Sequence, residues 1–239
     1  MITKYPYGNS FFFLLCNPDI IKSKIRGGIM KTIIINCSPR KNWNTARMLH
    51  EAKRGAESVG ADVEYFDLYD LKFTGCRSCL ACKRKDAQRC HCYWNDDLSA
   101  VIDKIFAADA LIIGTPIYFG DITSQFHALL ERLRFVALSY DDYQNYFKGK
   151  VNVGIVVTMN VTKQMYKDIY KTKLDDQWKA FNILNGSMHI LPVCDTLQVN
   201  DYEKYSMASF SEQHKKEVHD KQFPSDLKEA FQMGVSISK

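Results

Sequence analysis

Five of the eight cysteines lie within residues 76–92, at a spacing typical of metal and redox sites. They are Cys76, Cys79, Cys82, Cys90 and Cys92. Gaps of two residues let thiolates converge on one centre, and the first three match the start of the C-x2-C-x2-C run that binds bacterial iron–sulfur clusters. Zinc is the alternative, because a C-x2-C step and a C-x-C step would supply four thiolates and leave Cys82 free. The bases between Cys82 and Cys90 are expected to lower thiol pKa values, or simply to form a solvated loop.

A second group of polar side chains lies at residues 36–45, which read N-C-S-P-R-K-N-W-N-T. This stretch precedes a predicted helix, whose free N–H groups and dipole favour a phosphate. Arg40 and Lys41 add charged donors. Neither G-x-G-x-x-G nor a Walker loop is present, which argues against a dinucleotide or triphosphate site. The alternative is a plain helix cap formed by Asn44 or Thr45.

A third stretch, residues 114–121, reads G-T-P-I-Y-F-G-D and follows a predicted buried strand. Its aromatic and aliphatic side chains can pack against a planar ring, while backbone groups bind the polar edge of the ring. Aromatic loop residues also often extend the core. Together with a phosphate site on the same sheet edge, this loop favours a mononucleotide with a large flat ring, such as FMN.

The elements that must position these loops alternate between buried strands and amphipathic helices. Apolar, β-branched runs predict strands at 32–36, 63–68, 110–114, 151–158 and 190–199. Helical spacing predicts helices at 45–59, 98–106, 122–136 and 176–184, with two polar helices at 203–220 and 225–233. Asp96 or Asp97 is expected to cap the second helix. Alternating strands and helices imply an α/β fold: a flavodoxin-like, doubly wound, five-stranded parallel sheet with helices on both faces. Ligands then bind at the carboxyl ends of its strands.

Composition excludes several classes of protein. The chain has 239 residues, is 46% hydrophobic and 25% charged, and carries a net charge of +5, which is the balance of an ordinary globular domain. Its longest apolar run, residues 11–16, is far too short for a membrane helix. No basic stripe indicates nucleic acid. Clustered cysteines in a chain with a strong core favour a reducing, cytoplasmic compartment over a disulfide framework.

The N-terminal 29 residues are expected to be a dispensable extension. The apolar run at 11–16 has too short a core and too few flanking bases for a signal peptide. Gly27 and Gly28 precede Met30, and the first strand begins just beyond. One domain over residues 30–239, with a cysteine-rich insert at 76–92, is therefore predicted. An ordered arm that packs on the domain or on a partner subunit is the alternative.

These motifs together resemble the NADPH-dependent FMN reductase-like flavodoxin family, and most closely its iron–sulfur flavoprotein branch. The resemblance is carried by N-x-S-P-R-K-x-x-N-T, the C-x2-C-x2-C run, Asp96-Asp97 and P-I-Y-F-G, and covers about residues 30–233. It implies that the FMN phosphate is held by Ser38, Arg40, Asn42, Asn44 and Thr45. It also implies that the isoalloxazine ring lies along Pro116, Ile117, Tyr118, Phe119 and Gly120, with Thr158 closing the far side. Cys37 and Trp43 depart from the smaller residues common in the family.

The same resemblance implies a cofactor for the cysteines and a reaction. Cys76, Cys79, Cys82 and Cys90 would bind a [4Fe–4S] cluster, although flavodoxin-like relatives also keep some of these cysteines without a metal. The protein would be an FMN-dependent oxidoreductase that takes electrons from NAD(P)H or a reduced carrier and passes them to a small-molecule or protein redox partner, with the cluster as a one-electron relay. A homodimer or homotetramer is implied. The alternative is a non-catalytic electron carrier or a thiol or metal redox sensor.

Overall fold

A central parallel sheet organises the molecule, which is described here by a computed structural model covering residues 28–239. Its five strands, in the order β2-β1-β3-β4-β5, run over Asp62–Asp67, Lys31–Asn36, Ala110–Pro116, Val151–Thr158 and Asn185–Val193. All four neighbouring pairs are parallel. This is the flavodoxin-type strand order, so the predicted fold class is confirmed. The predicted extension at 1–29 lies almost wholly outside the described residues.

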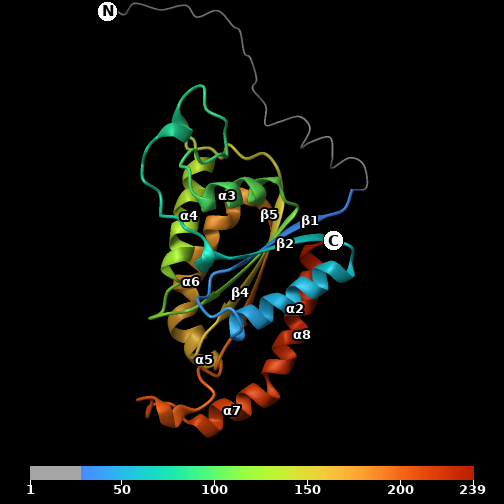
Figure 1. Cartoon of the computed structure of the whole chain (residues 1–239), viewed down its shortest axis with the longest axis vertical. Helices are drawn as coiled ribbons and strands as arrows, with labels where there is room; N and C mark the ends of the chain where they lie inside the picture. Colours follow the sequence, from blue (N-terminus) through green and yellow to red (C-terminus); the bar gives the residue numbers. More distant parts are fainter. Residues whose placement is uncertain (1–27) are drawn as a thin grey trace, which may run out of the picture.

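Helices cover both faces of the sheet (Figure 1). The main helices are α2 (Asn44–Ser58), α3 (Asp97–Ala107), α4 (Ser124–Ala137), α5 (Lys163–Met165), α6 (Lys171–Trp178), α7 (Glu212–Lys221) and α8 (Phe223–Ile237). Side chains alternate along a strand, so Ile34 packs with α2 and α8 while Ile33 and Ile35 pack with α3, α4 and α6. Both faces of the central strands are therefore buried, which explains why apolar residues follow one another without alternation at their centres. Within the described part of the chain, no helix is both long and apolar enough to cross a bilayer.

The segment at residues 163–202 departs from the predicted boundaries. Helical structure starts at Lys163, well before residue 176, and passes through a π-helical turn (Tyr166–Tyr170) and a 3-10 segment (Lys179–Leu184). The last strand was predicted at 190–199 but runs over Asn185–Val193. Pro192 is accommodated because β5 is an edge strand that pairs with β4 alone. The apolar residues beyond it form a small separate cluster, centred on Leu197, Val199 and Tyr202.

The two C-terminal helices also differ from the prediction. The stretch predicted at 203–220 is helical mainly from Glu212, after a short 3-10 turn at Tyr202–Lys204. The helix predicted at 225–233 extends over Phe223–Ile237 and is amphipathic rather than polar. It buries Phe223, Ala230 and Met233 against the sheet face that α2 also covers. The final helix is thus a full part of the core.

Two glycines allow α2 and α8 to pack backbone against backbone, and both are sites where a side chain would not fit. A Cβ on Gly234 would lie 1.9 Å from the Ala52 carbonyl oxygen, and one on Gly55 would lie 2.0 Å from the Phe231 carbonyl oxygen. Both obstacles are backbone atoms, which cannot rotate away as a side chain can. The helices would have to separate to admit either methyl group.

We therefore expect Gly234→Ala to destabilise the fold, although alanine is the better helix former. Overpacking of this kind typically costs about 1–3 kcal/mol, which urea unfolding would detect. Ser236→Ala is the matched control, because the Ser236 hydroxyl bonds only to the Met233 carbonyl of its own helix. A Gly234→Ala protein as stable as that control would contradict the close approach of the two helices.

Candidate functional site

The loops after β1, β3 and β4 meet at the carboxyl edge of the sheet, as predicted. The Cys37 N–H donates to the Gly114 carbonyl at 2.8 Å, and the Thr123 hydroxyl donates to the Cys37 carbonyl at 3.0 Å. The Thr45 and Thr158 hydroxyl oxygens lie 2.7 Å apart. Residues from three segments that are distant in sequence therefore form one surface.

The loop after β1 leaves the start of α2 without a side-chain cap. Trp43 occupies the cap position, and no side chain caps the helix. Asn44 and Thr45 lie inside the first turn, so the plain-cap alternative is wrong. The Ser38 hydroxyl is buried and accepts the Arg40 N–H at 3.1 Å. The first N–H groups of a 15-residue helix, with the Ser38 and Thr45 hydroxyls beside them, suit an anion such as phosphate.

Two of the residues predicted to bind phosphate have their side-chain donors engaged elsewhere. Arg40 Nη1 donates to the Gln198 carbonyl at 2.5 Å, and Asn44 Nδ2 donates to the Leu197 carbonyl at 2.7 Å. Trp43 Nε1 donates to the same Leu197 carbonyl at 3.1 Å. These side chains fasten the segment after β5 onto the loop. The remaining predicted residue of this group, Asn42, is exposed.

The loop after β3 forms a tight turn that presents aromatic rings outward. Tyr118 and Asp121 exchange two backbone hydrogen bonds, at 2.8 and 3.0 Å. Phe119 and Gly120 both have positive φ, and the Phe119 side chain is fully exposed. A Cβ on Gly120 would lie 2.7 Å from the Tyr170 ring, so glycine is required for conformation and for space. The Ile117 N–H joins this turn to β4 through the Thr158 carbonyl, at 2.9 Å.

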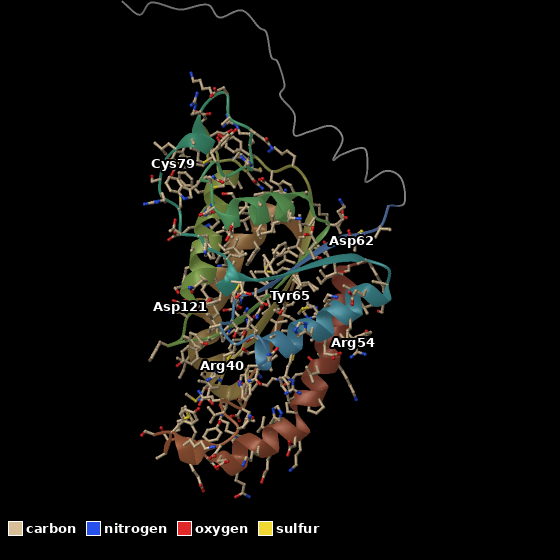
Figure 2. The ribbon with its side chains drawn as sticks, in the orientation of Figure 1. Arg40, Arg54, Asp62, Tyr65, Cys79 and Asp121 are labelled. Atoms are coloured by element: carbon tan, nitrogen blue, oxygen red, sulfur yellow. The ribbon has the colours of Figure 1, made fainter. Side chains whose placement is uncertain are left out.

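Asp121, the last residue of this turn, is held by side chains from α4 and α6. Its carboxylate lies 3.2 Å from His127 Nε2 on α4 and 2.8 Å from Lys173 Nζ on α6. Burial pushes the pKa of Asp121 upward, but its hydrogen bonds to Lys173 and the Ile122 N–H, with the nearby charges, hold it below its ordinary value. In Figure 2, Asp121 lies at about mid-height and Arg40 below it, and both are well separated from Cys79 near the top. The loops after β1 and β3 and the cysteine-rich segment therefore form two distinct regions.

The cysteine region contains a small cavity, called here the cysteine pocket. Its lining residues are Gly75, Cys76, Arg77, Cys79, Cys82, Cys92, Tyr93, Trp94, Arg132, Phe135 and Val136. The first three predicted ligands therefore face one space, together with Cys92. Cys90 is buried but does not line the pocket. Over residues 28–239, no three Cys, His, Asp or Glu side chains are arranged closely enough to hold a metal ion.

The bases around the cysteines are mostly engaged by other groups. Lys83 Nζ bonds to the Phe135 and Leu138 carbonyls, and Arg84 pairs with Asp86. Burial raises the pKa of the Cys82 thiol above its ordinary value, and the charge of Lys83 offsets this only in part. Lys83 therefore lowers the Cys82 pKa as expected, but burial outweighs this effect and the net shift is upward.

Sequence reasoning missed Arg132, a buried arginine on α4 that lines the cysteine pocket. Its side chain is 1% exposed. Nη1 bonds to both Asp96 carboxylate oxygens, at 2.7 and 2.6 Å, and Nη2 donates to Ser99 Oγ at 2.7 Å and to Cys92 Sγ at 3.1 Å. The sequence signal was available, because Arg132 falls on the apolar face of α4 between Leu129 and Val136. Asp96 also caps α3, which confirms one of the two predicted caps.

A parallel sheet of this strand order, with an open helix start and an aromatic turn at its carboxyl edge, defines the flavodoxin-like class of folds. Within that class, residues 30–167 match the family described as NADPH-dependent FMN reductase. The chain belongs to this family.

Curated relatives include two iron–sulfur flavoproteins. One, from Methanocaldococcus jannaschii, is 32% identical over 125 residues, which is 52% of this chain and 62% of that protein. The other, from Archaeoglobus fulgidus, is 36% identical over 105 residues, which is 44% of this chain and 49% of that protein. The chain thus spans about half to two-thirds of the length of these relatives.

Solved structures with the same fold have low sequence identity to this chain. An NAD(P)H:quinone oxidoreductase from Methanothermobacter marburgensis superposes with a TM-score of 0.61 at 16% identity, covering 87% of this chain and 98% of that one. An azoreductase from Bacillus anthracis gives 0.60 at 10% identity, covering 87% and 100%. At these identities, the likeness establishes the fold alone.

Proposed function

We propose that this protein is an FMN-dependent oxidoreductase. The observation that carries the proposal is the meeting, at one sheet edge, of an uncapped helix start, two buried hydroxyls and an aromatic turn. FMN, when bound, supplies the hydride and electron transfer chemistry. Membership of the NADPH-dependent FMN reductase family and the iron–sulfur flavoprotein relatives support the same conclusion.

The residues of this edge would divide the work of binding FMN. Ser38 and Thr45, with the first N–H groups of α2 and the exposed Asn42, would hold the phosphate. Arg40 and Asn44 would act by fastening residues 197–198 over the loop, as their hydrogen bonds suggest. The ring would lie along the turn formed by Pro116, Ile117, Tyr118, Phe119 and Gly120, with Thr158 on its far side. The outward Phe119 is suited to contact a second subunit, in a homodimer or homotetramer.

The cysteine pocket would hold a [4Fe–4S] cluster that relays single electrons. The donor set fits in number and type, because four thiols from one short segment line one cavity beside a buried arginine. Over residues 28–239 these thiols are not yet gathered closely enough to hold a metal, so cluster binding would have to draw them together. Helix α4 connects the two regions: it begins just after the aromatic turn, and Arg132 lies about 12 Å further along its axis at 1.5 Å per residue. The donor would be NAD(P)H or a reduced carrier, and the acceptor a small molecule or a protein.

Steady-state turnover tests this proposal. Purified protein loaded with FMN is mixed with NADH or NADPH and a quinone, and nicotinamide oxidation is followed at 340 nm. We expect catalytic oxidation that depends on FMN. If NADH or NADPH reduces the bound FMN once, but no acceptor supports continued nicotinamide oxidation, the result would instead support the electron-carrier alternative. Failure to bind FMN at all would contradict the proposal.

A further inference from the structure

We propose that Cys92, rather than Cys90, supplies the fourth thiolate of the cysteine pocket, and that Arg132 is the buried cation that positions it. This inference rests on the proposed function, in which the pocket holds an iron–sulfur cluster. It concerns which residues of this chain build the site. Three observations support it: which thiols line the pocket, how the backbone separates Cys90 from Cys92, and which atoms Arg132 contacts.

The first observation is which cysteines line the cysteine pocket. Cys76, Cys79 and Cys82 line it, as the C-x2-C-x2-C spacing predicts, and Cys92 is the remaining cysteine that does so. Cys90 is 8% exposed and belongs to the hydrophobic cluster beneath the loop. A fourth ligand must reach the space that the other three share. Cys92 already borders that space, whereas Cys90 would have to leave the core.

The second observation is the backbone conformation of Cys90, which has a φ of +59°. A non-glycine residue in this left-handed region turns the chain sharply. The side chains of residues i and i+2 point to the same side of the backbone only in an extended strand. The turn at Cys90 therefore explains how Cys90 enters the core while Cys92 borders the pocket.

The third observation is the set of hydrogen bonds that Arg132 makes beside the pocket. Its Nη2 donates to Cys92 Sγ at 3.1 Å and to the Ser99 hydroxyl, while Nη1 donates to the Asp96 carboxylate. Its Nε is buried and has no hydrogen-bond partner among the described residues. A buried unpaired N–H on a charged side chain is costly, so its place on the wall of a thiol-lined pocket points to an anionic occupant. Charge-assisted hydrogen bonds stabilise thiolates, and hydrogen bonds to the sulfurs tune a cluster.

Matched cysteine variants test the ligand assignment. The wild type, Cys82→Ala, Cys90→Ala and Cys92→Ala are reconstituted anaerobically with ferrous iron and sulfide, and iron, sulfide and visible absorption are measured per chain. We expect about four irons in the wild type, loss of most of the iron in Cys82→Ala and Cys92→Ala, and near wild-type content in Cys90→Ala. FMN content and Tm show which variants are folded.

The outcomes separate this inference from the proposed function. Full iron in Cys92→Ala with loss in folded Cys90→Ala would overturn the assignment and leave the cluster in place. A wild type that takes up no iron, or takes up zinc instead, would overturn the cluster and the assignment together. Loss of iron in Cys92→Ala but not in Cys90→Ala supports the assignment.

The role of Arg132 needs a readout that folding alone would not change. Asp96→Asn keeps the helix cap and the arginine, whereas Asp96→Asn with Arg132→Gln removes the cation as well. We expect a lower cluster midpoint potential in the double variant than in Asp96→Asn, because loss of a positive charge disfavours the more negative reduced state. Equal potentials at equal iron content would show that Arg132 is only structural.

Discussion

Replacing Ser38 and Thr45 together by alanine is expected to weaken FMN binding by a factor of roughly 10² to 10⁴. Each hydroxyl is buried beside the open start of α2, and each would bond to a charged phosphate. Hydrogen bonds to charged groups are worth about 1.5–3 kcal/mol each, so two give roughly 3–6 kcal/mol. The dissociation constant can be measured by flavin fluorescence quenching on apoprotein.

The same experiment has a matched control on the same helix. Ser58 lies at the far end of α2, and its hydroxyl bonds to the Gly55 carbonyl. Ser58→Ala should therefore bind FMN as the wild type does. Because the Thr45 hydroxyl also contacts Thr158, unfolding curves should accompany the titration to show that the double variant keeps its fold. Wild-type affinity in a folded double variant would mean that the phosphate lies elsewhere.

Arg132→Met is expected to cause a large loss of stability in the apoprotein, independently of any cofactor. The change leaves the Asp96 carboxylate, which is 10% exposed, without its cation. Removing one partner of a buried ion pair typically costs about 3–5 kcal/mol. Urea unfolding of the cofactor-free protein measures this loss directly.

Two further variants isolate the cause of that loss. Adding Asp96→Asn to Arg132→Met should recover part of the stability, because the unpaired charge is removed while the cap of α3 is kept. Lys53→Met breaks the exposed Lys53–Glu57 pair on α2 and should change stability by no more than about 1 kcal/mol. An Arg132→Met effect as small as that of Lys53→Met would show that the Arg132–Asp96 pair is not buried as described.

Elements whose signal is local could be predicted from the amino-acid sequence alone. Ile33, Ile34 and Ile35 alternate between two helix layers, so all three had to be apolar, and that pattern can be recognised without a structure. The same holds for α3, whose repeat and cap at Asp96 lie within one short stretch. Parallel strands separated by helices then restrict the topology to few choices, and place the loops after β1 and β3 at one edge.

Contacts with partners distant in the chain could be known only from the folded structure. Arg40 and Asn44 have phosphate-binding chemistry, yet their donors meet carbonyls more than 150 residues away. Arg132 has an ordinary helical position, and its contact with Cys92 exists only because α4 packs beside the cysteine segment. The spacing of cysteines 90 and 92 could not separate a core thiol from a pocket thiol. Sequence periodicity reports which face of an element is buried, whereas the partner of a polar group depends on which segments the packed core brings within about 3 Å of each other.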